Sequence, residues 1–135
     1  MKERKKIMKF FVNEEKRTVV AIVDKCLSDF RNRISKNPFF EILYVANDYK
    51  GGEWTFMNES YKGIAKCHPN DVFDVEIGKE IAKNRALRKY YSDLRLKYSR
   101  FFDMLDEIAD VADKNYDMII DRIENLDADF SELMS

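Results

Sequence analysis

Short apolar runs separated by polar turns occupy the first half of the chain. Residues 7–12 and 18–23 are rich in β-branched and aromatic side chains, and the polar residues 13–17 lie between them. This pattern predicts a β-hairpin with a five-residue connection. Three later runs are predicted as strands on the same grounds: residues 39–45, residues 54–57 and Tyr61–Lys66. The first half of the chain therefore predicts a small antiparallel β-sheet.

One short helix is predicted within this β-rich part. Leu27, Phe30 and Ile34 recur at spacings of three and four, as they do on one face of a helix. Asp24 precedes them and carries the side chain of an N-cap residue. Residues 35–38 are expected to end the helix, because a proline disfavours the helical conformation of the residue before it.

The C-terminal part has the pattern of a long helix. Residues 79–135 contain neither Gly nor Pro, and a single helix of that length would be about 85 Å long at ~1.5 Å per residue. Its apolar residues recur in steps of four and three, as in a coiled-coil seam: Leu87, Tyr91, Leu94, Tyr98, Phe101, Leu105, Ile108 and Ala112, then Tyr116, Ile119, Ile123, Leu126, Phe130 and Leu133. A seam of this length needs a partner surface, so we expect a homo-oligomer, dimeric or larger.

The seam has one irregularity, at the step from Ala112 to Tyr116, where two steps of four follow each other. Such an irregularity is either a stutter in a continuous helix or the loop of a helical hairpin. If the helix is interrupted, residues 113–115 are the best place for the break, and the sequence leaves both possibilities open.

These elements combine into an α+β fold: a small antiparallel β-sheet with a short helix, followed by long C-terminal helices that mediate oligomerisation. The chain has 135 residues, of which 45% are apolar, which is enough for the core of one domain. We expect residues 1–72 to form the β-rich portion and residues 73–135 to form the long helical portion of that single domain.

Charge is distributed unevenly although the net charge is only −1. Residues 79–100 contain eight Lys or Arg against two acids, whereas residues 101–135 contain two against eleven. A protein that coats nucleic acid would rarely carry so many acids, so the charge pattern favours a local anion site and we do not expect nucleic acid as a partner.

Cysteine usage and hydropathy indicate a cytoplasmic protein. Cys26 and Cys67 stand 41 residues apart, without a CxxC pattern. The sequence contains no signal-peptide hydrophobic region and no run of 18 apolar residues. We therefore expect reduced thiols, a cytoplasmic location and no membrane partner.

Cys67 and the chain's single histidine, His68, are candidates for a metal site or a nucleophile. Asp71 and Asp74 follow them within six residues of the sequence. A structural zinc site needs about four Cys, His or carboxylate ligands, and no second ligand pair is present. Adjacent side chains of an extended segment point in opposite directions, so His68 is poorly placed to activate Cys67. We interpret the pair as the end of a strand and the start of a turn, with Asp74 as a helix N-cap, and predict no catalytic residue, metal ion or cofactor.

The helix that follows Asp74 carries the candidate binding residues. At about 100° per residue, one narrow face holds Ile77, Ile81, Asn84, Arg88, Tyr91 and Arg95, and Arg85 flanks it. The two isoleucines are expected to pack on the sheet, and the polar residues are expected to continue this sheet-facing line where the helix leaves the sheet.

A crevice at that place would suit a phosphate-bearing ligand. Arginine binds phosphate through two parallel hydrogen bonds, Asn84 offers an amide to a ribose or a base edge, and Tyr91 or Phe73 offers a ring for stacking. The alternative is that the cations form a solvated face, which balances the acidic half of a partner helix in an antiparallel bundle. Both interpretations remain open from the sequence.

Residues 63–89, GIAKCHPNDVFDVEIGKEIAKNRALRK, carry a family resemblance. A GxAKCHPxD turn, followed by FD, a glycine and a helix that ends in RALRK, is similar to small phage-encoded proteins with an N-terminal sheet and long C-terminal helices. It most resembles the first family of Thoeris anti-defence proteins. The resemblance covers residues 61–89 best and the order of strands and long helices more loosely.

The resemblance implies a phage sponge that silences a bacterial immune pathway. Such proteins bind cyclic ADP-ribose-type signals, and in some members cyclic oligonucleotides, without turnover and in pockets shared between subunits. It implies that arginines of the long helix and a stacking aromatic hold the ligand. The residues of this chain that could serve in these roles are Phe73, Asn84, Arg85, Arg88, Arg95 and Arg100. The alternative is a phage inhibitor or architectural protein whose long helices engage a host protein or nucleic acid.

Overall fold

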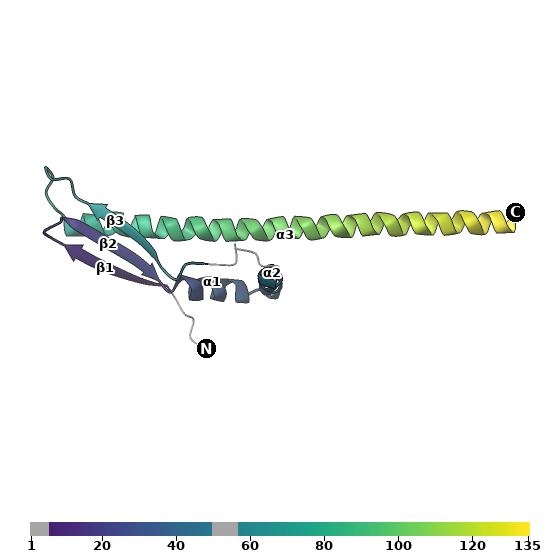
Figure 1. The fold of residues 1–135 in the computed structure, drawn as a ribbon, viewed down its shortest axis with the longest axis horizontal. Helices are drawn as coiled ribbons and strands as arrows, with labels where there is room; N and C mark the ends of the chain where they lie inside the picture. The colour runs from purple at the N-terminus through teal and green to yellow at the C-terminus, as the bar shows by residue number, and fades with distance from the viewer. Residues whose placement is uncertain (1–5, 50–56) are drawn as a thin grey trace. The chain divides into compact units, whose positions relative to one another are not determined.

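The N-terminal part of the fold is an antiparallel sheet. In the computed structural model, which describes residues 6–49 and 57–135, the sheet has three strands in the order β1-β2-β3 (Figure 1). The strands are β1 (Ile7–Asn13), β2 (Thr18–Asp24) and β3 (Tyr61–Lys66). This confirms the α+β fold class, a hairpin at the predicted place and the predicted last strand. The hairpin connection is residues 14–17, one residue shorter than predicted, because Asn13 still belongs to β1. Residues 54–56 lie outside the described residues, and Met57 belongs to no strand.

One face of the sheet is buried in the core. The side chains of Val19, Ala21 and Val23 alternate with more exposed neighbours along β2, and each is at most 1% exposed. Tyr61 and Ala65 are buried on the same face of β3, because Val23 pairs with Tyr61 and Val19 pairs with Ala65. The period of two expected for a half-buried strand therefore sets which residues enter the core.

Helix α1 (Cys26–Ser35) follows β2 directly. Phe30 and Ile34 are buried, as predicted, and the helix ends where the sequence before Pro38 indicated. The predicted N-cap was wrong: Asp24 is the last residue of β2, and Lys25 is the N-cap residue, with a positive φ of 63° and no side-chain cap. Asp24 Oδ1 instead accepts a hydrogen bond from the Lys25 backbone N–H at 2.8 Å. Lys25 alone, in the left-handed backbone conformation, connects the strand to the helix. Asp24 therefore remains paired with Ile7 in the sheet.

Residues 39–45 form a helix and not the predicted strand. They belong to α2 (Pro38–Tyr49). Asn37 Oδ1 accepts a hydrogen bond from the Phe39 backbone N–H at 2.9 Å, which is the contact of an N-cap residue with position N2. Pro38 then occupies the first helical position, where its missing N–H costs nothing. A continuous apolar run fits a buried strand or a buried helix equally well, and here the start signal decides for the helix.

Helix α3 (Val75–Met134) has 60 residues and passes through residues 113–115 without a break. The irregular step of the seam is therefore a stutter in a continuous helix. Asp74 caps the helix as predicted, since its Oδ1 accepts hydrogen bonds from the backbone N–H groups of Glu76 at 3.0 Å and Ile77 at 3.2 Å. The chain divides into two units, Met1–Ser99 and Arg100–Ser135, which are described separately.

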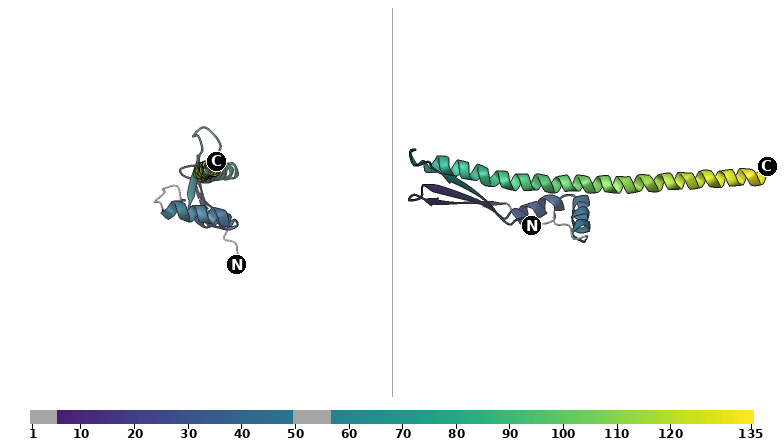
Figure 2. Two further views of the ribbon diagram at one scale, coloured as in Figure 1. Left: turned by 90° about the vertical axis from the view of Figure 1, so that its right-hand side faces the viewer. Right: turned by 45° about the horizontal axis from the view of Figure 1, so that its top comes forward.

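Small residues join α3 to the sheet. Figure 2 shows the N-terminal part of α3 running alongside the sheet. Ala82 and Ala86 are fully buried there. A Cβ atom added to Gly63 would lie 2.1 Å from the Ala82 carbonyl oxygen and 2.4 Å from the Ala86 nitrogen, so the helix backbone approaches β3 very closely. Only a strand residue without a side chain permits this approach.

The isoleucines predicted to pack on the sheet do not face it. Ile77 is 59% exposed and Ile81 is 41% exposed. The sheet-facing positions are Gly78, Ala82 and Ala86, spaced four residues apart. The prediction was wrong because it assigned the larger apolar residues to the interface, whereas the close approach at Gly63 leaves room only for small ones.

Hydrogen bonds between tyrosine and aspartate side chains also connect α3 to the rest of the first unit. The Tyr90 hydroxyl donates to Asp29 Oδ2 of α1, and the Tyr61 hydroxyl donates to Asp93 Oδ2. Asp93 also forms an ion pair with Lys97, whose Nζ lies 3.4 Å from Asp93 Oδ1. Buried polar groups of this kind stabilise a structure only when they are paired, as they are here.

Candidate ligand-binding surface

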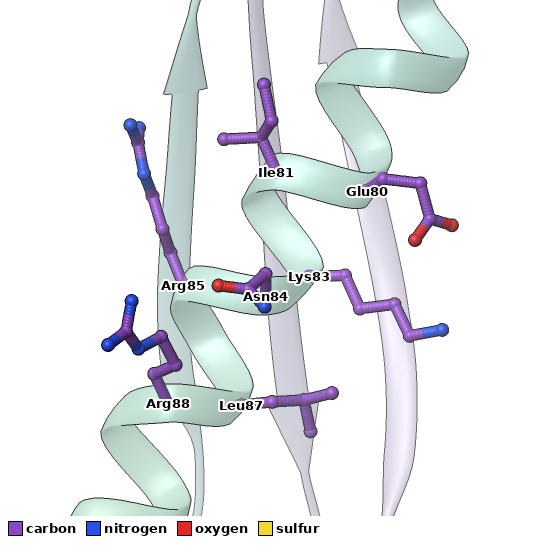
Figure 3. Close-up of a pocket in the computed structure, with 7 residues that line it drawn as sticks. All are labelled: Glu80, Ile81, Lys83, Asn84, Arg85, Leu87 and Arg88. Carbon is purple, nitrogen blue, oxygen red and sulfur yellow. The ribbon is translucent and has the colours of Figure 1, made fainter.

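A concavity of about 470 Å³ lies on the exposed surface of α3 (Figure 3). It is lined entirely by residues of one stretch of that helix: Glu80, Ile81, Lys83, Asn84, Arg85, Leu87 and Arg88. In Figure 3, Arg85 and Arg88 project on one side of the helix and Lys83 on the other, with Asn84 between them. The structure thus brings together three residues that the sequence predicted as ligand contacts, Asn84, Arg85 and Arg88. We call this feature the basic concavity.

The basic concavity faces away from the sheet, and the predicted sheet-facing line of polar residues is therefore wrong. Figure 3 shows the strands behind the helix and Asn84 in front of it. Ala82 and Ala86 define the buried side, and Asn84 lies two residues from each, roughly 200° around the helix axis. The rotation of the helix about its own axis, which Gly63 and the two alanines set, places Asn84 in solvent.

Positive charge predominates around the basic concavity. Its lining has three cations, Lys83, Arg85 and Arg88, against one carboxylate, Glu80. Among residues 6–49 and 57–135, neither Lys83 nor Arg88 forms an ion pair. Cations without a protein partner remain available for an anionic ligand.

Arg85 has a second contact that the sequence did not indicate. Its Nη1 donates a hydrogen bond to the Ile64 carbonyl oxygen at 2.5 Å. One helical turn later, Lys89 Nζ donates to the Lys62 carbonyl oxygen at 2.7 Å. Because β3 pairs with β2 only, these carbonyls belong to the open edge of the described sheet, and the two cations satisfy acceptors that would otherwise face water. Arg85 therefore also stabilises the strand edge.

The remaining predicted contacts lie outside the basic concavity. Phe73 is half-buried and lines a neighbouring concavity of about 330 Å³, which shares Ile81 with the first. Tyr91 is 45% exposed and stacks on Tyr90 with 5.4 Å between ring centroids. Arg95 is exposed further along α3, and Arg100 belongs to the second unit.

Cys67 and His68 make the contacts of a turn. The Arg17 side chain contacts this segment: Nη2 donates to Cys67 Sγ at 3.4 Å and Nη1 donates to the Pro69 carbonyl oxygen at 3.0 Å. His68 Nδ1 accepts a hydrogen bond from the Asn70 backbone N–H at 3.2 Å. Within residues 6–49 and 57–135, no three His, Cys, Asp or Glu side chains are grouped to hold a metal ion. No sequence pattern predicts this role of Arg17, which lies in the connection between β1 and β2.

The other cysteine, Cys26, is fully buried in the core. Burial raises the pKa of its thiol to about 12, with the carboxylate of Asp29 acting in the same direction. A thiol of this kind stays protonated at neutral pH and behaves as a small apolar side chain.

Comparisons with protein families, with curated proteins and with solved structures find no match to this chain. None of the helices in the described part of the chain combines the length and apolar character needed to cross a membrane. Among the residues that the structure describes, the basic concavity is the feature best suited to a small anionic ligand.

Proposed function

We propose that this protein binds a nucleotide-type signal of the cyclic ADP-ribose class and sequesters it without cleaving it, as a phage immune-evasion sponge in the host cytoplasm. One observation carries the proposal: Lys83, Asn84, Arg85 and Arg88 line one open concavity on the surface of α3, in which only Glu80 is acidic. A ligand with two phosphates and a sugar would meet cations and an amide in the same place.

The lining supplies the groups that such a ligand requires. The planar guanidinium of Arg88 matches two phosphate oxygens at once, and Lys83 adds a compact positive charge. The Asn84 amide can donate and accept hydrogen bonds with a ribose hydroxyl or a base edge. Ile81 and Leu87 offer apolar surface beside these polar groups. The concavity has a volume of about 470 Å³ and is open to solvent, since one helix supplies its whole lining.

Binding without turnover agrees with the side chains around the concavity. Among its seven lining residues, Glu80 is the one carboxylate, and neither histidine nor cysteine is present. A general acid–base pair or an activated nucleophile would need such groups within hydrogen-bonding reach of each other. The proposal therefore involves recognition only.

The family resemblance supports the choice of ligand class. Residues 61–89, which carry the resemblance to the first family of Thoeris anti-defence proteins, include the whole lining of the basic concavity. That family sequesters cyclic ADP-ribose-type signals through arginines of a long helix, and cyclic oligonucleotides are the second class of probe to test.

The test is calorimetric titration of the full-length protein with cyclic ADP-ribose, and separately with a cyclic dinucleotide and with inorganic phosphate. We expect tight binding of one nucleotide, and we expect heat denaturation of the complex to release that nucleotide unchanged, as judged by chromatography. Arg88→Ala should weaken binding about tenfold or more, because it removes a charge-assisted bidentate contact. Arg31→Ala, which removes an exposed arginine of α1 outside the concavity, should leave the affinity unchanged.

Three outcomes would contradict the proposal. The first is the absence of binding to both nucleotides, and the second is recovery of a cleaved product. The third is equal affinity in wild type and in an Arg88→Ala, Lys83→Ala double variant. Loss of binding in Arg31→Ala would show that the ligand lies elsewhere on the protein.

A further inference from the structure

The second unit of the chain exposes a continuous apolar surface. Residues 100–135 consist of the C-terminal part of α3. Eight of its large apolar side chains, spaced three, four or eight residues apart, are between 47% and 84% exposed. We call them the C-terminal stripe: Leu105, Ile108, Tyr116, Ile119, Ile123, Leu126, Phe130 and Leu133. An isolated helix with this much exposed apolar surface is not stable in water, so the stripe requires a covering surface.

The structure separates this stripe from the earlier part of the predicted seam. Leu94 is buried in the first unit, and Leu87 is half-buried there. Tyr98 packs edge-on against Phe40 of α2, with ring centroids 5.8 Å apart. The first half of the seam is thus used largely within one chain, and the second half is the part available to another molecule.

Acidic residues avoid the C-terminal stripe. Residues 101–135 contain eleven acids, and at about 100° per residue only Asp127 and Asp129 flank the stripe. The other nine lie toward the opposite side of the helix: Asp103, Asp106, Glu107, Asp110, Asp113, Asp117, Asp121, Glu124 and Glu132. The stripe is therefore almost uncharged, although this part of the helix carries a net charge of −9 (two cations against eleven acids).

This charge placement distinguishes between possible partners. Acidic residues directly beside an apolar stripe favour a basic partner helix, because they form ion pairs with it across the interface. In this chain the acids are placed where two like-charged helices can approach without strong repulsion. The stripe therefore suits a second copy of the same acidic helix better than it suits a basic helix. The basic half of α3 in another copy of the chain is one such basic helix, and it is disfavoured for the same reason.

We propose that residues 101–135 are the self-association element of this protein, and that copies of the chain pack their C-terminal stripes against each other. The acids then remain on the outer surface of the resulting bundle, in solvent. This inference does not depend on ligand binding at the basic concavity, which lies in the other unit of the chain. It narrows the expected oligomer contact to one segment.

The test is the molar mass of the full-length protein, measured by light scattering during gel filtration over a dilution series. The wild type should have the mass of two or more chains. Ile119→Asp with Ile123→Asp, which places charge at the centre of the stripe, should shift the mass to that of one chain. Ala128→Asp is the matched control, because it adds the same carboxylate on the opposite side of the helix and should leave the mass unchanged.

Near-ultraviolet circular dichroism checks that the first unit stays folded in each variant, since Tyr61 and Tyr90 are buried there. A wild-type mass equal to one chain would overturn the proposal. An unchanged mass in the Ile119→Asp, Ile123→Asp variant would overturn it as well, and so would dissociation caused by Ala128→Asp alone. A monomer that forms a defined complex with a host protein through the stripe would assign the surface to that partner instead.

Discussion

The hydroxyl of Tyr90 in α3 donates a hydrogen bond to the carboxylate of Asp29 in α1, and the two residues are 61 positions apart in the sequence. Both are buried, and Arg33 Nε donates to the same Oδ2 atom at 2.9 Å. The long helix that carries the basic concavity is thus tied to α1 by a polar contact inside the core. Its orientation depends on this contact as well as on apolar packing.

Replacement of Tyr90 by phenylalanine should destabilise the first unit by about 1–3 kcal/mol, because it removes one donor from a buried carboxylate while it preserves the ring. The free energy of unfolding from urea titration is the measurement. Tyr91→Phe is the matched control, since Tyr91 is exposed at the neighbouring position and its change should cost less than about 0.5 kcal/mol. Equal losses in the two variants would show that the Tyr90 hydroxyl contributes nothing specific.

Asp29 should also make the stability depend on pH. Burial acts to raise the pKa of its carboxyl, but the hydrogen bonds from Tyr90 and Arg33 outweigh burial and hold the pKa below its ordinary value. A carboxyl whose pKa is lower in the folded state binds fewer protons there than in the unfolded chain. Its stabilising contribution is therefore complete above the ordinary aspartate pKa of about 3.9 and is lost as the pH falls through the folded-state value.

The measurement is the free energy of unfolding of wild type and of Asp29→Asn from neutral to acidic pH. The difference between them should be largest near neutrality and should shrink as the pH falls below about 4. Parallel profiles over the whole range would contradict this assignment, because they would show that the charge of Asp29 does not contribute.

Gly63→Ala should be one of the most damaging single changes in the first unit. Its Cβ would lie 2.1 Å from the Ala82 carbonyl oxygen and 2.4 Å from the Ala86 nitrogen, and these backbone atoms cannot rotate away. We expect a loss of roughly 3 kcal/mol or more, measured by urea unfolding, since overpacking against a rigid backbone forces the helix and the strand apart.

Gly78→Ala provides the control for this change. Its Cβ would lie 2.7 Å from Cγ2 of the buried Val19, so this side chain must repack but no backbone atom has to move, and alanine gains about 1 kcal/mol over glycine inside a helix. Gly78→Ala should therefore cost clearly less than Gly63→Ala. The opposite order would mean that the close approach of α3 to β3 is not the constraint inferred here.

At residues 39–45 two local sequence signals predict different elements, and the prediction followed the wrong one. The start signal of α2 was present in the sequence, because Asn37 and Pro38 are preferred residues for the N-cap and the first helical position. The apolar composition of residues 39–45 favours a strand, whereas this start signal favours a helix, and the strand prediction was wrong because the start signal decides. The same kind of signal at Asp74 correctly predicts the start of α3.

Some of the predicted binding residues lie together in the structure and others do not. Asn84, Arg85 and Arg88 were predicted together and lie around one concavity, because their spacing along a helix is local geometry. The same helix geometry predicts Tyr91, and ring chemistry predicts Phe73, but both lie outside that concavity.

By itself the sequence determined the hairpin, the last strand, the cap of α3 and the grouping of its cations, since these follow from residues close together in the chain. Only the tertiary structure decided which face of α3 is buried. That face depends on Gly63, which admits Ala82 and Ala86, and on Asp29, which receives the Tyr90 hydroxyl. These partners lie about 20 to 60 positions apart, and contacts over such distances form only when the whole chain packs. The tertiary structure therefore moved the predicted arginines from a crevice against the sheet to an open surface of the helix.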